Sequence, residues 1–506
     1  MIAEHPVVCR TVTYGVLELG IALAALALPA AERAGPHGRP GGLLMNTDYL
    51  QSGLDRRTPV RDPSIMPLHP VLLEKLNAAL GAAPSPAFTP RDARLPTVPG
   101  KVHAVIGMRR AGKTTFLRQL LAERRAVLPP ERSLYLSFDD DRLAGLGVDQ
   151  LGFLLEEYYR RHPALRGRKT VHWLLDEIQL VPGWERFVRR VLDSEKVEIA
   201  VSGSSARMLS REVHTSLRGR GMATVIRPFS FREFLRHRGE EPVKEARRWT
   251  AAERSLVEKR FRDFLVEGGF PEAQGLAPAV RIELLQGYVD TVLFRDVVER
   301  YGVSQVAALR WLVRQCLRNP AASFSVHRLH QDLKAQGHGV AKDAVHAMLG
   351  HLLDGFLLSV VPLATDSERK RNSNPRKLYP ADPGFIQAFD ASGRANVGHA
   401  LETVVLNELE RRSAEVGYVK TGDGLEVDFR ARHRAGGEEL VQVCADPSAP
   451  ETGSREWRAL ADAAREHPRA TRRLLVLDRD ALVRASTPGV EIQPAYEWLL
   501  TAPGKD

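Results

Sequence analysis

The chain has 506 residues, of which 43% are hydrophobic and 26% are charged. These values exclude a mainly disordered polymer and a bundle embedded in a membrane, and the length predicts three or four domains. The formal net charge of +10 favours polyanionic partners but does not establish one. Because Cys9, Cys316 and Cys444 form no C-x-x-C pair, we predict neither a disulfide framework nor a zinc site, and we expect a reducing cytoplasm.

The N-terminal residues do not resemble a folded domain. The apolar run Gly20–Leu28 is too short to span a bilayer, so no membrane anchor is predicted, although a secretory signal peptide is the competing interpretation. A Gly/Pro-rich stretch, AGPHGRPGG, follows this run. We therefore expect residues 1–65 to be a disordered extension and linker, with Met45 as an alternative start.

The first chemical motif is a phosphate-binding loop. Gly107, four residues, and then Gly112, Lys113 and Thr114 fit the pattern G-x-x-x-x-G-K-[ST]. The apolar run Val102–Ile106 before it predicts a buried parallel strand, and TTFLRQLLAERR after it has helical spacing. Lys113 is expected to reach the β- and γ-phosphates, and the Thr114 hydroxyl to bind Mg²⁺. The predicted nucleotide contacts are Gly107, Arg110, Ala111, Gly112, Lys113, Thr114 and Thr115.

A second apolar strand ends in two acids. Val171–Leu175 predicts the strand, and Asp176 and Glu177 follow it. We expect Asp176 to hold Mg²⁺ together with Thr114, while Glu177 acts as the catalytic residue that polarises the attacking water. An acidic pair at a strand end is by itself ordinary surface charge, and only the phosphate loop upstream favours the metal interpretation.

A third apolar strand, Val197–Val201, is followed by the letters SGSS. If this strand inserts between the two preceding ones, Ser204 or Ser205 would lie near the γ-phosphate. The alternative is a plain N-terminal cap of a helix, because serine is a favoured residue at that position.

The motifs in their order resemble the bacterial and archaeal AAA-type P-loop ATPases that carry a C-terminal domain with a restriction-endonuclease-like core. The resemblance covers roughly residue 72 to the C-terminus and rests on GMRRAGKTT, YLSFDDDRL, LLDEIQLVPGWE, VSGSSARML, LRGRGMATVIRPFSFREFL, GGFPEA, YVDTVLFRDVVERYG and GHALETVVLNEL. It implies ATP and Mg²⁺ as cofactors. It also implies that Arg220 or Arg218 contacts the nucleotide phosphate, often across a homo-oligomer interface; a solvated basic turn is the equal alternative.

The fold class that follows is α/β: an AAA-like P-loop NTPase parallel sheet, then a winged helix, then a small α/β restriction-endonuclease-like domain. The predicted boundaries are 66–235 for the ATPase core, 236–303 for a helical lid, 304–383 for the winged helix and 384–506 for the nuclease-like domain. Within the lid, Arg295 and Asp296 are expected to form a structural ion pair on one helix.

The winged-helix prediction rests on three helical stretches followed by a hairpin. The helices are Arg310–Leu317, Val326–Lys334 and a third within VAKDAVHAMLGHLLDGFLL, and the hairpin strands are Leu357–Leu363 and a short return at Leu378. The loop between the strands carries Arg369, Lys370, Arg371, Arg376 and Lys377. Such a loop suits DNA phosphates, so DNA is a candidate partner, although a basic hairpin tip is usually only solvated.

The last domain matches only part of the nuclease pattern. Glu402 on a helix and Asp428 on a strand fit, but residues 442–444, Gln-Val-Cys, stand where E-x-K is required. A carboxylate ligand and the lysine are both missing, so we expect the domain to cut nothing. Asp446 and Glu439 are the two acids that could replace the missing ligand.

The function predicted from the sequence is a Mg²⁺-dependent ATPase that acts as a switch or remodeller on protein or nucleic acid. Two alternatives remain: an ATP-dependent nuclease in defence or repair, and a DNA-binding regulator for which ATP is only a conformational ligand. The missing E-x-K disfavours the first alternative. The presence of the water-positioning acid, Glu177, disfavours the second.

Overall fold

The computed structural model describes residues 68–81, 87–203, 217, 219–390, 396–445, 450–480 and 489–501. The chain divides into two units, residues 1–65 and 66–506, and the described residues all belong to the second. The predicted linker and the alternative start at Met45 therefore lie outside the described residues. Within the described ranges, no helix combines the length and the apolar character that a membrane crossing requires.

The first sheet has five parallel strands in the order β2-β3-β4-β1-β5. They are β1 (Val102–Ile106), β2 (Ser133–Ser137), β3 (Val171–Asp176), β4 (Val197–Ser202) and β5 (Gly221–Val225). Every residue of β1 and β3 is buried, as expected for strands with helices on both faces. The predicted parallel α/β fold is confirmed, and β4 does insert between β3 and β1.

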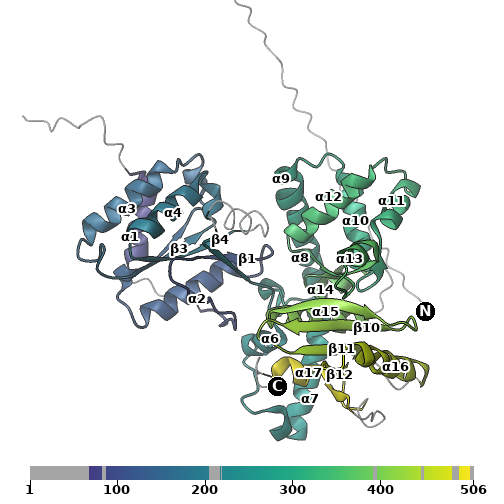
Figure 1. Ribbon diagram of the computed structural model, residues 1–506. Coiled ribbons are helices and arrows are strands. Elements are labelled where there is room, and N and C mark those ends of the chain that lie inside the picture. The colour runs from purple at the N-terminus through teal and green to yellow at the C-terminus, as the bar shows by residue number, and fades with distance from the viewer. Residues whose placement is uncertain are drawn as a thin grey trace, which may run out of the picture. The chain divides into compact units, whose positions relative to one another are not determined.

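Helices cover both faces of this sheet (Figure 1). The helices are α1 (Pro70–Leu80), α2 (Lys113–Arg125), α3 (Asp149–Arg161) and α4 (Trp184–Ser194). Helix α2 packs on one face, while α1, α3 and α4 share the core of the other. The strands end at one edge of the sheet because they are parallel, so the segments after β1, β3 and β4 emerge together there.

The predicted lid, residues 236–303, divides between two cores. Its elements, with the helix before it, are α6 (Phe231–His237), α7 (Ala251–Glu267), α8 (Pro278–Thr291), the π-helix η6 (Val292–Val298) and α9 (Glu299–Tyr301). Helices α6 and α7 contribute aromatic side chains to the core of the C-terminal sheet. In contrast, α8 and η6 share a core with the region that follows them.

The next region contains three longer helices, two short ones and a small antiparallel sheet with the strand order β6-β8-β7. Its elements are α10 (Val306–Arg318), β6 (Ser323–Phe324), α11 (Val326–Ala335), α12 (Lys342–Asp354), β7 (Leu358–Val361), α13 (Glu368–Ser373), β8 (Arg376–Pro380) and α14 (Gly384–Phe389). Helix α12 ends at Asp354, and Phe356 two residues later adopts a left-handed φ of 57°. The polar loop contains the short helix α13, whose N-terminus is capped by Ser367.

The C-terminal sheet has the order β13-β12-β11-β10-β9. Its elements are α15 (Val397–Arg411), β9 (Ala414–Lys420), β10 (Glu426–His433), β11 (Glu438–Cys444), α16 (Pro450–Glu466), β12 (Thr471–Val476), β13 (Glu491–Pro494) and α17 (Ala495–Leu500). The predicted inner face of α15, namely Leu401, Val405 and Leu409, is buried as expected. Helices α15 and α16 lie in separate cores, one on each face of the sheet.

Trp173 provides a test of the first core. Its side chain is 1% exposed and lies edge-on to Tyr158, with ring centroids 5.6 Å apart. We expect Trp173→Ala to lower the free energy of unfolding of this sheet by about 3–5 kcal/mol, because the cavity cannot refill. Chemical denaturation followed by circular dichroism measures this loss. Val127→Ala is the control, since Val127 is 78% exposed and should change stability by less than about 0.5 kcal/mol.

Candidate functional site

The phosphate loop is held in place by two glycines. Gly107 has a φ of 147°, and a β-carbon there would lie 2.1 Å from the carbonyl oxygen of Ile226. Gly112 has a φ of 97° and begins α2 without any side chain to cap the helix. The first N–H groups of α2, those of Lys113 to Thr115, therefore point toward the loop without an intrahelical acceptor. Uncapped N–H groups at a helix N-terminus form a binding site for anions.

Lys113 is buried, and its ammonium group bonds to its own loop. Nζ donates to the carbonyl oxygens of Gly107 and Met108, each at 3.0 Å. Burial lowers the pKa of Lys113, although the charges of Glu177 and Asp296 oppose that shift. The ammonium group is thus satisfied by neutral carbonyls at a place where an anion would be a stronger acceptor.

The predicted metal-binding acid, Asp176, sits in a network that links three strands. Its two carboxylate oxygens accept hydrogen bonds from the Ser202 hydroxyl and from the Tyr135 hydroxyl, the latter at 2.7 Å. The Ser202 hydroxyl also accepts the N–H of Glu177 at 3.2 Å. The sequence pointed instead to Ser204 and Ser205, which lie outside the described residues. The feature that could have identified Ser202 is its position as the last residue of a strand next to β3.

Glu177 has a strained backbone at the end of β3. Its φ of 55° is left-handed, which is uncommon for a residue other than glycine. Burial raises the pKa of its carboxyl group, and the charge of Lys113 partly offsets this shift. Its side chain accepts a hydrogen bond from Gln179. The roles predicted for Glu177 and Lys113 in nucleotide hydrolysis stay predictions.

Arg91 supports the loop from outside the motif, and sequence reasoning missed it. Its guanidinium donates to the carbonyl oxygen of Ala111 at 2.9 Å and lies 3.1 Å from Glu233. Its backbone N–H donates to Gln119 of α2 at 2.7 Å. Arg91 is only 5% exposed, so it fixes the loop rather than presenting charge to solvent.

Two arginines of the loop pair with acids from later in the chain. Arg109 Nε lies 3.0 and 2.9 Å from the two carboxylate oxygens of Asp296. Arg110, predicted to contact nucleotide, has a side chain that is 65% exposed and lies 3.6 Å from Glu272. The predicted pair between Arg295 and Asp296 is wrong: Arg295 pairs with Glu299, because the π-helix directs Asp296 toward the phosphate loop.

Arg220 does not reach the phosphate loop of its own chain. Its carbonyl oxygen accepts the N–H of Val102 at 2.8 Å, at the amino-terminal edge of the sheet. The phosphate loop leaves the opposite, carboxyl-terminal edge. The guanidinium of Arg220 pairs instead with Asp193. A catalytic role within one chain is thereby contradicted, a role in a neighbouring subunit stays a prediction, and Arg218 lies outside the described residues.

The acids that were predicted to form a nuclease-like site surround a lysine from another part of the chain. Lys377 of β8 is buried, and its Nζ lies 2.8 Å from Glu426 and 3.1 Å from Asp428. Tyr379, also of β8, donates to Glu402 at 3.1 Å. Burial by itself would lower the pKa of Lys377, but the surrounding carboxylates outweigh it and raise that pKa. Lys377 was predicted to be a DNA-contacting residue at a hairpin tip, and its burial contradicts that.

Among the described residues, Gln442 and Glu439 are both engaged by protein side chains. Gln442 donates to Glu456 of α16 and accepts the N–H of Asp428 at 3.2 Å. Burial, followed by the charge of Asp428, raises the pKa of Glu402 to about 8. Glu439 is engaged by His433 at 2.7 Å and by Arg473 at 3.1 Å, and Asp446 lies outside the described residues.

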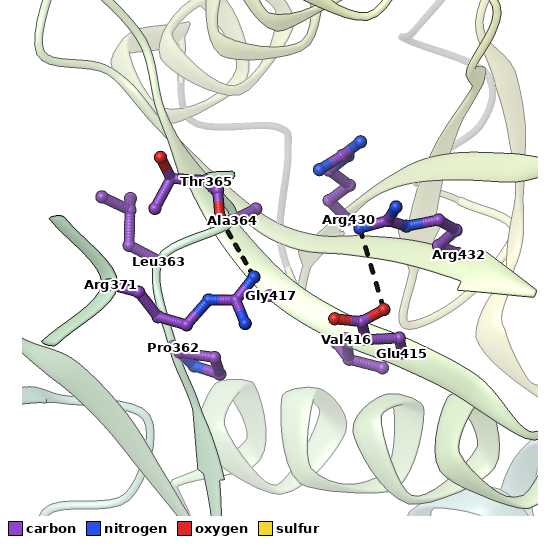
Figure 2. A pocket seen from close by; sticks show the side chains of 10 residues that line it. All are labelled: Pro362, Leu363, Ala364, Thr365, Arg371, Glu415, Val416, Gly417, Arg430 and Arg432. Carbon is purple, nitrogen blue, oxygen red and sulfur yellow. Dashed lines mark hydrogen bonds and ion pairs between the residues drawn. The ribbon is translucent and has the colours of Figure 1, made fainter. Parts of the chain in front are cut away.

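A separate small cavity lies between the hairpin loop and the C-terminal sheet (Figure 2). Its volume is about 30 Å³, enough for one or two water molecules and far too small for a nucleotide. Arg371 donates to the carbonyl oxygen of Thr365 at 3.0 Å, and Arg432 pairs with Glu415 at 3.7 Å. This cavity is therefore a packing feature of the junction rather than a ligand site.

Comparison with known families finds two matches. Residues 99–235 match an AAA domain, and residues 258–395 match a domain of unknown function, DUF8612. The chain is 30% identical over 430 residues to the uncharacterized protein MJ1544 of Methanocaldococcus jannaschii, covering 81% of this chain and 91% of that protein. It is 24% identical over 401 residues to an uncharacterized protein of Haemophilus influenzae, covering 79% of this chain and 94% of that protein.

Solved structures give weaker similarities. The Walker-type ATPase PABY2304 of Pyrococcus abyssi is 14% identical, with a TM-score of 0.38 and coverage of 63% of this chain and 95% of that chain. The ORC2 protein of Aeropyrum pernix is 14% identical, with a TM-score of 0.22 and coverage of 64% and 92%. These scores are too low to support a conclusion about this chain.

The contribution of the buried Lys377 to stability can be tested by replacing this residue. We expect Lys377→Met to destabilise the C-terminal region by about 3–5 kcal/mol, because it leaves carboxylates buried without their cation. Thermal unfolding of the purified variant measures this loss. Lys334→Met, the same substitution at an exposed position of α11, should leave stability nearly unchanged. Equal stability of the two variants would contradict the structural importance of this cluster.

Proposed function

Because this chain belongs to the same family as MJ1544 of Methanocaldococcus jannaschii and carries an AAA domain, we propose that it binds ATP and hydrolyses it in a Mg²⁺-dependent reaction. One observation carries the proposal. The buried Lys113 ammonium group, the uncapped start of α2 and the acids Asp176 and Glu177 meet at one edge of a parallel sheet. Such an arrangement suits a polyphosphate and a nearby cation.

ATP binding would begin when the Lys113 ammonium group exchanges its hydrogen-bond acceptors. Its ammonium group would turn from the carbonyl oxygens of Gly107 and Met108 to phosphate oxygens, which are charged and therefore stronger acceptors. The N–H groups of Gly112, Lys113 and Thr114 would donate to the same phosphates. Arg91 would keep the loop in this shape, since it already holds the carbonyl group of Ala111.

The residues at this edge fit a magnesium ion. Thr114 and Asp176 offer a hydroxyl and a carboxylate, and Asp176 is fixed by Ser202 and Tyr135. Mg²⁺ is usually held by one or two such protein groups together with phosphates and water, rather than by an all-protein cage. When bound, it would neutralise negative charge on the transferring phosphoryl group.

Glu177 is the residue that we assign to the attacking water. Its raised pKa makes it a better proton acceptor than an exposed glutamate, and Gln179 orients its carboxylate. Ser202 would connect Glu177 to Asp176 across β4, and Ser204 would sense the γ-phosphate. Arg220 would complete the site only from a neighbouring subunit, which requires a homo-oligomer.

We assign the energy of hydrolysis to a conformational switch or remodelling activity in the cytoplasm, with a protein or DNA as the partner. DNA contact through a winged helix is supported by the three helices and the small sheet of residues 306–380, and by the exposed Arg369. A nuclease is the less favoured function. Lys377 occupies the carboxylates that a catalytic metal would need.

The assignment of Glu177 predicts a separation of binding from turnover. We expect Glu177→Gln to bind ATP with an affinity similar to that of the wild type but to lose at least about 100-fold in turnover, because the amide cannot accept a proton. Isothermal titration with ATP and Mg²⁺ gives the affinity, and phosphate release gives the rate. Lys113→Ala should lose binding itself. Glu74→Gln, an exposed change on α1, is the matched control and should behave as the wild type. Unchanged turnover in Glu177→Gln would remove this residue from the mechanism.

Assays with duplex DNA distinguish an ATPase that acts on DNA, an ATPase that acts on a protein, and a nuclease. We expect DNA to leave no nicked product in the presence of Mg²⁺ or Mn²⁺, because the nuclease-like acids are occupied by Lys377. ATP turnover measured with and without DNA reports whether DNA is the partner. Stimulation supports action on DNA, and its absence points to a protein partner. Metal-dependent nicking that disappears in Asp428→Asn would establish the nuclease instead.

A further inference from the structure

The phosphate loop forms an ion pair with a later part of the chain through Arg109 and Asp296. Arg109 Nε lies within 3.0 Å of both carboxylate oxygens, and the Asp296 side chain is only 4% exposed. The second contact, Arg110 with Glu272, is longer and more than half exposed on both sides. Exposed pairs contribute little to stability, so the pair of Arg109 and Asp296 is the stronger of these two ion pairs.

The phosphate loop and the π-helix also share a core. Met108 and Ala111 of the loop are buried in the same cluster as Leu293 and Val297 of η6. That cluster continues into α10 and α12. A change at the loop can therefore reach the three-helix region through directly packed side chains, without an intervening linker.

The negative charge of Asp296 would oppose the binding of an anion to the phosphate loop. Its carboxylate pairs with Arg109, a residue of the phosphate loop itself, so its negative charge lies beside that loop. A nucleoside triphosphate would bring several negative charges to the same loop. The buried carboxylate would repel them, while it also holds Arg109, the cation that could neutralise them.

The segment that carries Asp296 is a π-helix, η6. In η6 the N–H of Glu299 bonds to the carbonyl oxygen of Phe294, five residues earlier, as in a π-helix. π-Helices are rare, and they occur frequently at functional sites. Relaxation to an α-helix would rotate the residues after Phe294 relative to those before it. The ion pair of Arg109 and Asp296 forms while this segment is a π-helix.

We propose that the pair of Arg109 and Asp296 is an autoinhibitory latch on the nucleotide site, closed without nucleotide and opened when a nucleoside triphosphate draws Arg109 onto its phosphates. This inference rests on the proposed ATP binding. Opening of the latch releases η6, and η6 transmits the nucleotide state to the α10–α12 region that packs on it.

The test is the affinity of Asp296→Asn for ATP with Mg²⁺, measured by isothermal titration. Asparagine has the same shape and can still accept a hydrogen bond from Arg109, but it carries no charge. We expect this variant to bind ATP about tenfold more tightly than the wild type, because the repulsion is gone and Arg109 is released. A purely structural ion pair predicts the opposite result, weaker binding together with a lower melting temperature.

Hydrogen exchange of residues 292–301 gives a second measurement. ATP with Mg²⁺ should speed exchange there in the wild type, and Asp296→Asn should show the faster exchange without ATP. Arg295→Gln is the matched control, because Arg295 belongs to the same π-helix but pairs with the exposed Glu299. Its affinity for ATP should equal that of the wild type.

The outcomes separate the latch from the proposed function. If the wild type binds ATP, and Asp296→Asn binds it equally or more weakly, the latch is wrong while ATP binding stands. If exchange of residues 292–301 does not respond to ATP, the latch is also wrong. If the wild type takes up no ATP, both the latch and the proposed function fail.

Discussion

The parallel sheet is the constraint on which the site depends. Because its strands run in one direction, the loop after β1, the acids after β3 and Ser202 at the end of β4 must emerge at a single edge. The buried ammonium group of Lys113 then needs acceptors, and in this structure it takes them from its own loop. The site is therefore preorganised for an anion before any ligand is present.

The phosphate loop is bonded to two different parts of the molecule. Arg91 ties it to Glu233 on one side, and Arg109 ties it to Asp296 on the other. Apolar residues of the loop are buried with helices that come more than 150 residues later in the chain. A ligand that changed the shape of this loop would therefore also change contacts that the later helices use.

In the C-terminal region, too, a buried cation is held by polar groups around it, and that cation is Lys377. Lys377 satisfies a group of buried carboxylates that would otherwise repel one another. Since Lys377 and Tyr379 come from β8, they also join the small antiparallel sheet to the C-terminal sheet. The cluster therefore connects the two sheets. Its ammonium group balances the negative charge of the carboxylates, as a metal ion would in an open site.

The sequence by itself determined the parallel sheet, the phosphate loop and the acids, because continuous apolar runs, glycine spacing and strand ends are local features. It also determined the inner face of α15. Only the tertiary structure decided the partners of Asp296 and Lys377 and the position of Arg220. Each of these charges is matched by residues far away in the chain, and a charge pattern does not reveal which distant residue will be buried against it.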